Sequence, residues 1–373
     1  MEIEVDRDRA VEVLGVLREL RRQKYYPFDR SVLPQTLTPA SIQNNRPLHS
    51  SFLFYACHYM RGGIESEQVF RALFVIHAKY PWMFEPGVVA EKSHEEIKAV
   101  LKNHIGWDAE TASKYWWLNS QLLVKHWGGE VLNVIRGLHS YEEGKRRIRN
   151  KRSEELYSLD STEFGFYGFQ EKMVSMIIYF WDWAGLLEKK FLYAPPVDFH
   201  HCRLMLGLEI VKVSNLNRGG LRYVEKLQEP IRNLLLWYCR RYKADPKEIA
   251  DVLWLHSKDL CGISPVTTTW EDKENPFEFD IATRAQILKG QKKKIIQTCG
   301  VCAVRHFCNY AIPAGPYYGR TQEEQGKRGR VVDGGKIILL PRSKNFDNIA
   351  PKDFRFRRPS PIDVQEGLWK EID

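Results

Sequence analysis

The chain has 373 residues, of which 43% are hydrophobic and 12% aromatic; this is enough to bury the core of one large domain or two modest ones, and it excludes a disordered chain. Its formal net charge of +9 favours a polyanionic partner. The first residues lack the apolar core of a signal peptide, and the longest apolar run, Met173 to Trp181, is stopped by Asp182, so we expect a cytoplasmic, nucleoid-associated protein with no membrane-spanning helix.

Most of the chain has the periodicity of helices. Arg9 to Lys24 repeats apolar residues at steps of three and four with basic residues between them, which predicts an amphipathic helix that ends before Pro27. Residues 28–49 are polar and contain prolines, and they predict a loop. Further helices are predicted near residues 50–60, 66–79, 94–104, 109–126, 128–138, 163–185, 199–213, 220–242 and 246–258.

A basic stretch follows the predicted helix near 128–138. It is either a solvated helical face or a surface that contacts a phosphate backbone. Its basic residues are Lys145, Arg146, Arg147, Arg149, Lys151 and Arg152.

The last part of the chain changes in composition. Residues 262–298 form a polar insert rich in lysine, and residues 311–373 are richer in glycine, proline and arginine. The run RVVDGGKIILL predicts a β-hairpin that turns at Asp333 to Gly335. Three further arginines in this tail are candidates for phosphate contacts: Arg355, Arg357 and Arg358.

Three of the seven cysteines lie close together. Cys299, Cys302 and Cys308 have the spacing C-x2-C-x5-C, which lets one loop wrap three thiolates around a single centre. Four thiolates hold either zinc or an iron–sulfur cluster, and zinc sites usually contain a second C-x2–4-C pair, which this sequence lacks. Cys261 is the best candidate for the fourth ligand because it ends a helical run and is nearest in the sequence. The other cysteines have apolar or aromatic neighbours, as buried thiols do: Cys57, Cys202 and Cys239.

The stretches WLHSKDLC and CGVCAVRHFCNY resemble the iron–sulfur loop of the endonuclease III family of DNA glycosylases. That family binds a 4Fe-4S cluster through the spacing C-x6-C-x2-C-x5-C. The resemblance therefore implies a 4Fe-4S cluster on Cys261, Cys299, Cys302 and Cys308. This chain departs from the family in the first gap, where residues 262–298 stand, but a loop between ligands can lengthen at a small entropic cost.

Two further segments resemble the catalytic part of that family. FYGFQEK, which ends at Lys172, resembles the hairpin of its helix–hairpin–helix motif, and PPVDFHH places Asp198 at its catalytic aspartate. The resemblance implies that Asp198 stabilises the positive charge that develops on the sugar during N-glycosidic cleavage. It also implies that Lys172 is the nucleophile, as in the members with lyase activity. From the residues alone, Asp198 is also explained as a helix N-cap and Lys172 as a surface lysine on a helix.

The resemblance also assigns residues that contact DNA. Gly168, Phe169 and Gln170 lie in the hairpin that approaches a phosphate, and Gln170 replaces the second hairpin glycine of the family, which puts that contact in doubt. Arg61 falls in the segment that fills the gap left by a flipped base, although the two glycines after it also explain this stretch as the end of a helix. Arg203 falls in register with the family's segment after the aspartate.

The resemblance covers about residues 9 to 311 and implies an all-α fold of two helical lobes. We expect a glycosylase domain over residues 1–310 with an iron–sulfur loop over 261–308, and a basic C-terminal extension over 311–373 that holds the hairpin. The implied activity is the excision of a damaged or modified base from double-stranded DNA by a monomer, with lyase activity if Lys172 attacks the sugar. The alternatives are an N-glycosidase that acts on a free modified nucleoside or on RNA, and a non-catalytic iron–sulfur protein that binds DNA.

Overall fold

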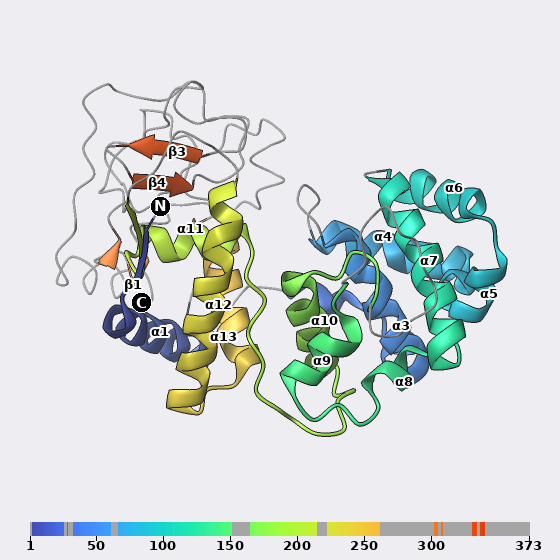
Figure 1. The fold of residues 1–373 in the computed structure, drawn as a ribbon, viewed down its shortest axis with the longest axis horizontal. Helices are drawn as coiled ribbons and strands as arrows, with labels where there is room; N and C mark the ends of the chain where they lie inside the picture. The colour runs from blue at the N-terminus through green and yellow to red at the C-terminus, as the bar shows by residue number, and fades with distance from the viewer. Residues whose placement is uncertain are drawn as a thin grey trace. The chain divides into compact units, whose positions relative to one another are not determined.

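The computed structural model of the chain divides into two compact units (Figure 1). The terminal unit comprises Met1–Ser31, Val197–Ala244 and Glu248–Asp373, and the central unit comprises Val32–Pro196 with Asp245–Lys247. Most residues beyond the predicted domain boundary at 310 lie outside the described part, so that boundary stays a prediction. The structure describes residues 2–25, 28, 33–60, 66–106, 108–150, 165–214, 222–261, 302–304, 307–308, 330–333 and 336–339.

The terminal unit is built on helices that the periodicity predicts. The first, α1 (Arg7–Arg22), begins where the Asp6 side chain accepts a hydrogen bond from the Arg9 N–H at 2.9 Å, and its apolar stripe is buried. Helix α11 packs against α12 and against the π-helix η5. The described helices after α1 are α11 (Phe199–Gly207), α12 (Arg222–Tyr242), α13 (Pro246–Leu255, in this unit from Glu248 onward) and η5 (His256–Cys261).

A small sheet, which the sequence does not predict, is added to the helices of this mostly helical unit. Strand β1 (Glu2–Val5) pairs antiparallel with β2 (Val211–Ser214), with Val5 opposite Val211. The helix predicted over residues 199–213 therefore ends at Gly207, and Glu209 adopts a positive φ of 54° before the chain turns into β2. The alternating sequences EIEV and VKVS are short, and only their pairing with each other makes them strands.

A second pair of strands lies near the end of the chain. Strand β3 (Arg330–Asp333) pairs antiparallel with β4 (Lys336–Leu339), with Asp333 opposite Lys336. The two residues between them lie outside the described part, so the tight turn at Asp333 to Gly335 stays a prediction. Arg355, Arg357 and Arg358 also lie outside it.

The central unit is helical in the part that the structure describes. Two predicted helices, α4 and α6, have the predicted bounds, and the Ser93–Glu96 capping box begins α6. The loop predicted over residues 28–49 is wrong from Pro34 onward, where a 3-10 turn, a short helix and the start of α3 occur. The helical elements are η1 (Pro34–Leu37), α2 (Ala40–Gln43), α3 (Arg46–Ala56), η2 (Cys57–Tyr59), α4 (Ser66–Lys79), η3 (Pro81–Phe84), α5 (Pro86–Glu91), α6 (His94–His104), α7 (Ala109–Trp127), α8 (Val131–Ile135), α9 (Tyr141–Ile148) and α10 (Glu171–Trp183).

The core of the central unit is aromatic. Tyr55 of α3 stacks on Trp116 of α7, with ring centroids 4.4 Å apart, and Phe52 stacks on Phe84 at 5.1 Å. These side chains are buried, and such pairs add packing energy beyond the area that they remove from water. Element η2 packs against both α3 and α7 beside these rings.

The most apolar segment, Met173 to Trp181, lies inside α10. Helix α10 is shorter than the predicted range 163–185, because residues 165–170 form a turn in which Gly165 and Gly168 have positive φ angles. Most of its apolar residues are buried in the central unit, whereas Met176 and Trp183 are partly exposed. Among the described helices, none is long and apolar enough to cross a membrane.

Candidate functional site

Asp198 is the N-cap of α11, in the terminal unit. Its Oδ1 accepts hydrogen bonds from the backbone N–H groups of His200 at 2.8 Å and of His201 at 3.2 Å. The Nδ1 atom of His201 lies 2.8 Å from the same oxygen and donates to it when it carries the ring proton. The Asp198 side chain is only 17% exposed. The carboxylate is therefore held in one orientation by the helix that it caps.

This arrangement favours the ionised carboxylate. The N-terminus of a helix carries a partial positive charge, and hydrogen bonds that end on a carboxylate stabilise its anionic form. The capping interpretation of Asp198 is thus correct, and it is compatible with catalysis, because the same contacts fix a negative charge in space. The role of His201 follows from its position in the sequence, three residues after the capping Asp198, where the partner residue of a capping box stands.

The backbone of α11 is tied to the helix that leads to the cysteines. The Ser257 hydroxyl of η5 donates to the carbonyl of His200 at 2.8 Å, and Ser257 is buried. Within the terminal unit, η5 therefore connects the segment of Asp198 to Cys261, which is the last residue of η5. The side chains of Arg203 and Cys261 lie outside the described part.

Two of the four predicted cysteine ligands have described side chains. Cys302 is 5% exposed and Cys308 is half-buried, and the Cys302 Sγ lies 3.5 Å from the Nε2 atom of His256. Cys299 lies outside the described residues. Within the part that the structure describes, no group of three metal-ligating side chains is found, and the predicted set is only half represented there.

The loop that contains Cys302 and Cys308 is anchored on α1. The Arg9 guanidinium donates to the carbonyl of Phe307 at 2.6 Å and lies 5.8 Å from the centroid of its ring. These contacts place a permanent positive charge beside the loop, and His256 places a ring nitrogen beside a buried thiol. Both features suit a group of thiolates, which is anionic. The three cysteines predicted to be buried thiols are buried: Cys57, Cys202 and Cys239.

The predicted hairpin is a compact turn in the central unit. The Phe166 N–H donates to the carbonyl of Ile148 at 3.0 Å, and the Asn150 N–H donates to the carbonyl of Phe169 at 2.7 Å. These bonds attach the turn to the end of α9, and α10 begins directly after it. Gly165 is required here, because it has a φ of 62° and a Cβ atom would lie 2.2 Å from the carbonyl oxygen of Arg149.

The hairpin does not need a glycine at Gln170. Gln170 has a φ of −89° and a ψ of 179°, an extended conformation that any residue adopts, and its side chain is exposed. Gly168 has a φ of 82°, a conformation that favours glycine. The departure from the family's hairpin pattern at Gln170 therefore leaves the backbone of the turn intact, and only its side chain is new on this surface.

Lys172 lies in the first turn of α10 and is half-buried. Its Nζ atom donates to the carbonyl of Met60 at 3.1 Å. Met60 follows η2 and directly precedes Arg61, which lies outside the described residues. The structure thus brings Lys172 beside Met60, in the segment that the sequence predicts to enter DNA. A half-buried lysine on a helix also fits the interpretation as a surface lysine, so its role as nucleophile stays a prediction. Lys172 belongs to the central unit, whereas Asp198 belongs to the terminal unit.

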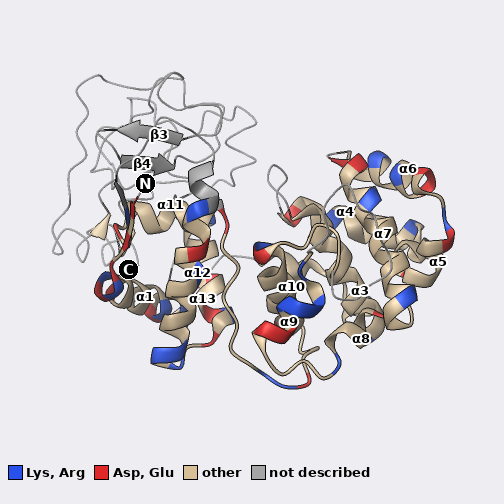
Figure 2. Ribbon diagram, in the orientation of Figure 1, with Lys and Arg blue, Asp and Glu red and all other residues tan. Residues whose placement is uncertain are grey.

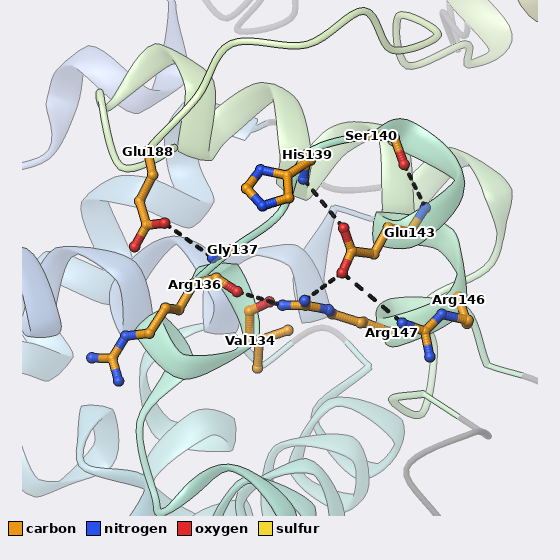
Figure 3. Close-up of polar contacts among 9 residues, drawn as sticks. All are labelled: Val134, Arg136, Gly137, His139, Ser140, Glu143, Arg146, Arg147 and Glu188. Carbon is orange, nitrogen blue, oxygen red and sulfur yellow. Dashed lines mark hydrogen bonds and ion pairs between the residues drawn. The ribbon is translucent and has the colours of Figure 1, made fainter.

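The basic stretch around α9 has a partly structural role (Figure 3). Helix α9 begins at Ser140, whose hydroxyl accepts a hydrogen bond from the Glu143 N–H at 3.2 Å. Arg147 donates to the carbonyls of Val134 at 2.9 Å and Arg136 at 2.7 Å, and it pairs with Glu143. Arg147 therefore caps the end of α8 and is committed to the fold.

The remaining charges of α9 have both signs (Figure 2). Burial opposes the ionisation of Glu143, but hydrogen bonds from the His139 N–H and from Arg147 outweigh it and lower the pKa of Glu143 below its ordinary value. Arg149 pairs with Glu171 at 3.0 Å, across the start of α10. Arg146 is 70% exposed, with Glu143 only at 3.9 Å. Of the described basic residues here, Arg146 is the one best placed to meet a partner.

No protein-family model matches the sequence, and no curated protein is significantly similar to it. Among solved structures, the chain is similar to one described as the structure of a thermostable thymine-DNA glycosylase, at 12% sequence identity and with a TM-score of 0.42. The match covers 82% of this chain and 97% of that chain. A TM-score below 0.5 does not establish a shared fold.

Proposed function

We propose that this chain is a DNA glycosylase of the helix–hairpin–helix type, which removes a damaged or modified base from double-stranded DNA. The observation that carries the proposal is the carboxylate of Asp198, held at the start of α11 by the backbone N–H groups of His200 and His201, which both donate to Oδ1. A carboxylate held in this way is suited to stabilise a positive charge on a neighbouring group without any reorganisation during the reaction.

The proposed reaction breaks the bond between the base and C1′ of the sugar. The base leaves with the bonding electron pair and takes up a proton, and the sugar becomes an oxocarbenium-like cation, which the negative charge of Asp198 stabilises. The cation is then captured at C1′ by water, or by the amine of Lys172 if Lys172 has lost its proton. Because the bond is hidden in a duplex, the nucleotide must first be flipped out.

The proposal assigns the turn at residues 165–170 to the phosphate backbone. The left-handed Gly168 and the N-terminus of α10 are features that let backbone N–H groups face an anion. Backbone hydrogen bonds attach the turn to the end of α9, and α10 follows the turn directly in the chain. Arg61, Arg203 and the side chain of Gln170 remain proposed DNA contacts.

The proposal includes a 4Fe-4S cluster on Cys261, Cys299, Cys302 and Cys308. The buried Cys302, with the imidazole of His256 beside it, and the Arg9 charge near Phe307 suit an anionic cluster. When bound, the cluster would tie η5 to the segment of residues 299–308 through iron–thiolate bonds. No step of the proposed reaction runs through it.

A panel of substrates tests the proposed function. The purified protein is incubated with duplexes that each contain one damaged or modified base, and with the matching free nucleosides and RNA, and the released base is measured by mass spectrometry. Release from at least one duplex supports the proposal. Release from a nucleoside or RNA alone would support the corresponding N-glycosidase instead, and duplex binding without release from any substrate would indicate a non-catalytic DNA-binding protein.

The role of Lys172 is tested by trapping. If Lys172 is the nucleophile, borohydride reduces its Schiff base with the sugar and links the protein covalently to substrate DNA, whereas Lys172→Gln gives no adduct. Lys114→Gln, in α7 of the same unit, removes an equal charge elsewhere and should leave trapping unchanged. If neither the unmodified protein nor the variant is trapped although base release continues, the enzyme is monofunctional and Lys172 is not its nucleophile.

Binding to duplex DNA should weaken with salt, because each neutralised phosphate releases counterions and contributes about −0.9 to the slope of log affinity against log salt. Arg146→Gln is expected to make this slope shallower by roughly that amount. The matched control is Arg22→Gln in α1: Arg22 is 63% exposed and pairs with a glutamate three residues earlier, as Arg146 does. Equal slopes for the two variants would exclude a specific phosphate contact of Arg146.

A further inference from the structure

Asn119 is a fully buried polar residue in the middle of α7. Its side chain has 0% exposure and makes two hydrogen bonds to the backbone of Tyr167 in the hairpin. Its Oδ1 accepts from the Tyr167 N–H at 2.7 Å, and its Nδ2 donates to the Tyr167 carbonyl at 3.0 Å. One amide side chain thus satisfies both backbone groups of a residue in the turn, as a neighbouring β-strand would.

The second N–H of Asn119 points to His58 in η2. Its Nδ2 lies 2.8 Å from the Nε2 atom of His58, and the Nδ1 atom of His58 lies 3.1 Å from the carbonyl of Tyr55. A carbonyl only accepts, so Nδ1 carries the ring proton, and Nε2 then accepts from the amide. The polar groups form one directed chain of hydrogen bonds from Tyr167 to α3, which leaves no choice in the orientation of the Asn119 amide.

Ring contacts support the same turn from two helices. Tyr115 lies four residues before Asn119, on the same face of α7, and its ring is parallel to that of Tyr167 with centroids 6.3 Å apart. Phe54 of α3 stacks on Phe169 at 5.1 Å. The hydrogen bonds of Asn119, in contrast, act directly on the backbone of Tyr167.

The contacts of Asn119 reach the two parts of the central unit to which the proposed function assigns DNA contact. Through Tyr167 it holds the residue directly before Gly168, and through His58 it holds η2, whose next residue, Met60, accepts the hydrogen bond of Lys172. The turn leads into α10, which carries Lys172. The hydrogen bonds of Asn119 and Lys172 therefore connect the turn, α10 and η2 in a closed circuit.

We propose that Asn119 is a positioning residue, which fixes the hairpin in the conformation that binds a DNA phosphate. The inference rests on the proposed function for its DNA readout, but the hydrogen bonds themselves are tested without DNA. If Asn119 only filled the core, its substitution would destabilise the unit but would affect the turn no more than the substitution of another buried residue of α7.

The test compares Asn119→Leu with Ser120→Ala. Leucine fills a similar volume and removes every hydrogen bond of the amide. Ser120 is the next residue of α7, is also fully buried, and binds the Tyr55 hydroxyl and the Trp116 carbonyl, not the turn. Asn119→Asp is the second variant, for the case that leucine prevents folding: it keeps an acceptor for the Tyr167 N–H but cannot donate to the Tyr167 carbonyl.

Hydrogen exchange of the Tyr167 amide is the first readout. It should be about tenfold faster or more in Asn119→Leu than in Ser120→Ala, as expected for the loss of one buried hydrogen bond, and close to the unmodified protein in Asn119→Asp. The second readout is duplex affinity at fixed salt, which should fall about tenfold or more in Asn119→Leu, as expected for one lost hydrogen bond to a charged phosphate, and remain unchanged in Ser120→Ala.

Equal exchange and equal duplex affinity in Asn119→Leu and Ser120→Ala would overturn the proposal, because Asn119 would then act only as part of the core. If Asn119→Leu does not fold, Asn119→Asp carries the test: loss of the bond to the Tyr167 carbonyl should displace the turn and lower duplex affinity below that of Ser120→Ala, and an equal affinity would overturn the proposal. If the unmodified protein binds duplex without any salt dependence, the proposed function fails, and the exchange measurement still decides whether Asn119 holds the turn.

Discussion

Asp198→Asn is expected to lower base release by roughly 100-fold or more while duplex binding stays nearly unchanged, because the charge of Asp198 acts mainly in the transition state. Asparagine is as good an N-cap as aspartate, so its side-chain oxygen can still accept the N–H groups of His200 and His201 and α11 should still form. The substitution thus removes the charge and keeps the cap. The measurement is single-turnover release of base from the duplex identified in the substrate panel.

Two further variants separate capping from catalysis. Asp198→Ala removes both the cap and the charge, and it should cost about 1 kcal/mol of stability in addition to activity. Asp245→Asn is the matched control, because the Asp245 carboxylate also accepts a backbone N–H at the start of a helix, from Lys247 at 2.9 Å in α13. It should release base at the normal rate. Full activity in Asp198→Asn would show that Asp198 is a cap alone and would remove the catalytic assignment.

Cys302→Ser is expected to abolish the iron–sulfur cluster. The unmodified protein should be brown, with a broad absorbance at about 400 nm from thiolate-to-iron transitions. It should also contain iron and sulfide. A serine hydroxyl is a poor ligand for the cluster, so the colour and the iron should be lost, and the melting temperature should fall because binding energy of the cluster is also folding energy.

The control for this substitution is Cys239→Ser in α12. Cys239 is also buried and lies in the same unit, but it is outside the predicted ligand set. Its substitution should disturb packing and leave the absorbance and the iron content unchanged. A colourless, stable protein that contains one zinc ion per chain would contradict the cluster, and loss of iron in Cys239→Ser but not in Cys302→Ser would contradict the choice of ligands.

The sequence by itself determined the helices and the local features that begin and end them. Each of these features depends on residues only a few positions apart, since the hydrogen bonds of a helix span four residues. Examples are the apolar spacing of α1, α4 and α6, the cap at Asp6 and the capping box at Ser93. For the same reason Asp198 could be recognised as the start of a helix. The spacing of Cys299, Cys302 and Cys308 is likewise local, and it predicts a shared centre without knowledge of the fold.

Only the tertiary structure decided which distant residues meet. The strands β1 and β2 are too short to be predicted separately, and their pairing depends on the return of the chain after α11. Lys172 and Met60 are 112 residues apart, and Asn119 and Tyr167 are 48 apart, so no periodicity or spacing relates them. A buried asparagine is costly unless every polar group finds a partner, and the folded core supplied those partners. Arg147 shows the same dependence, since its sequence context predicts a surface charge and the end of α8 makes it a cap.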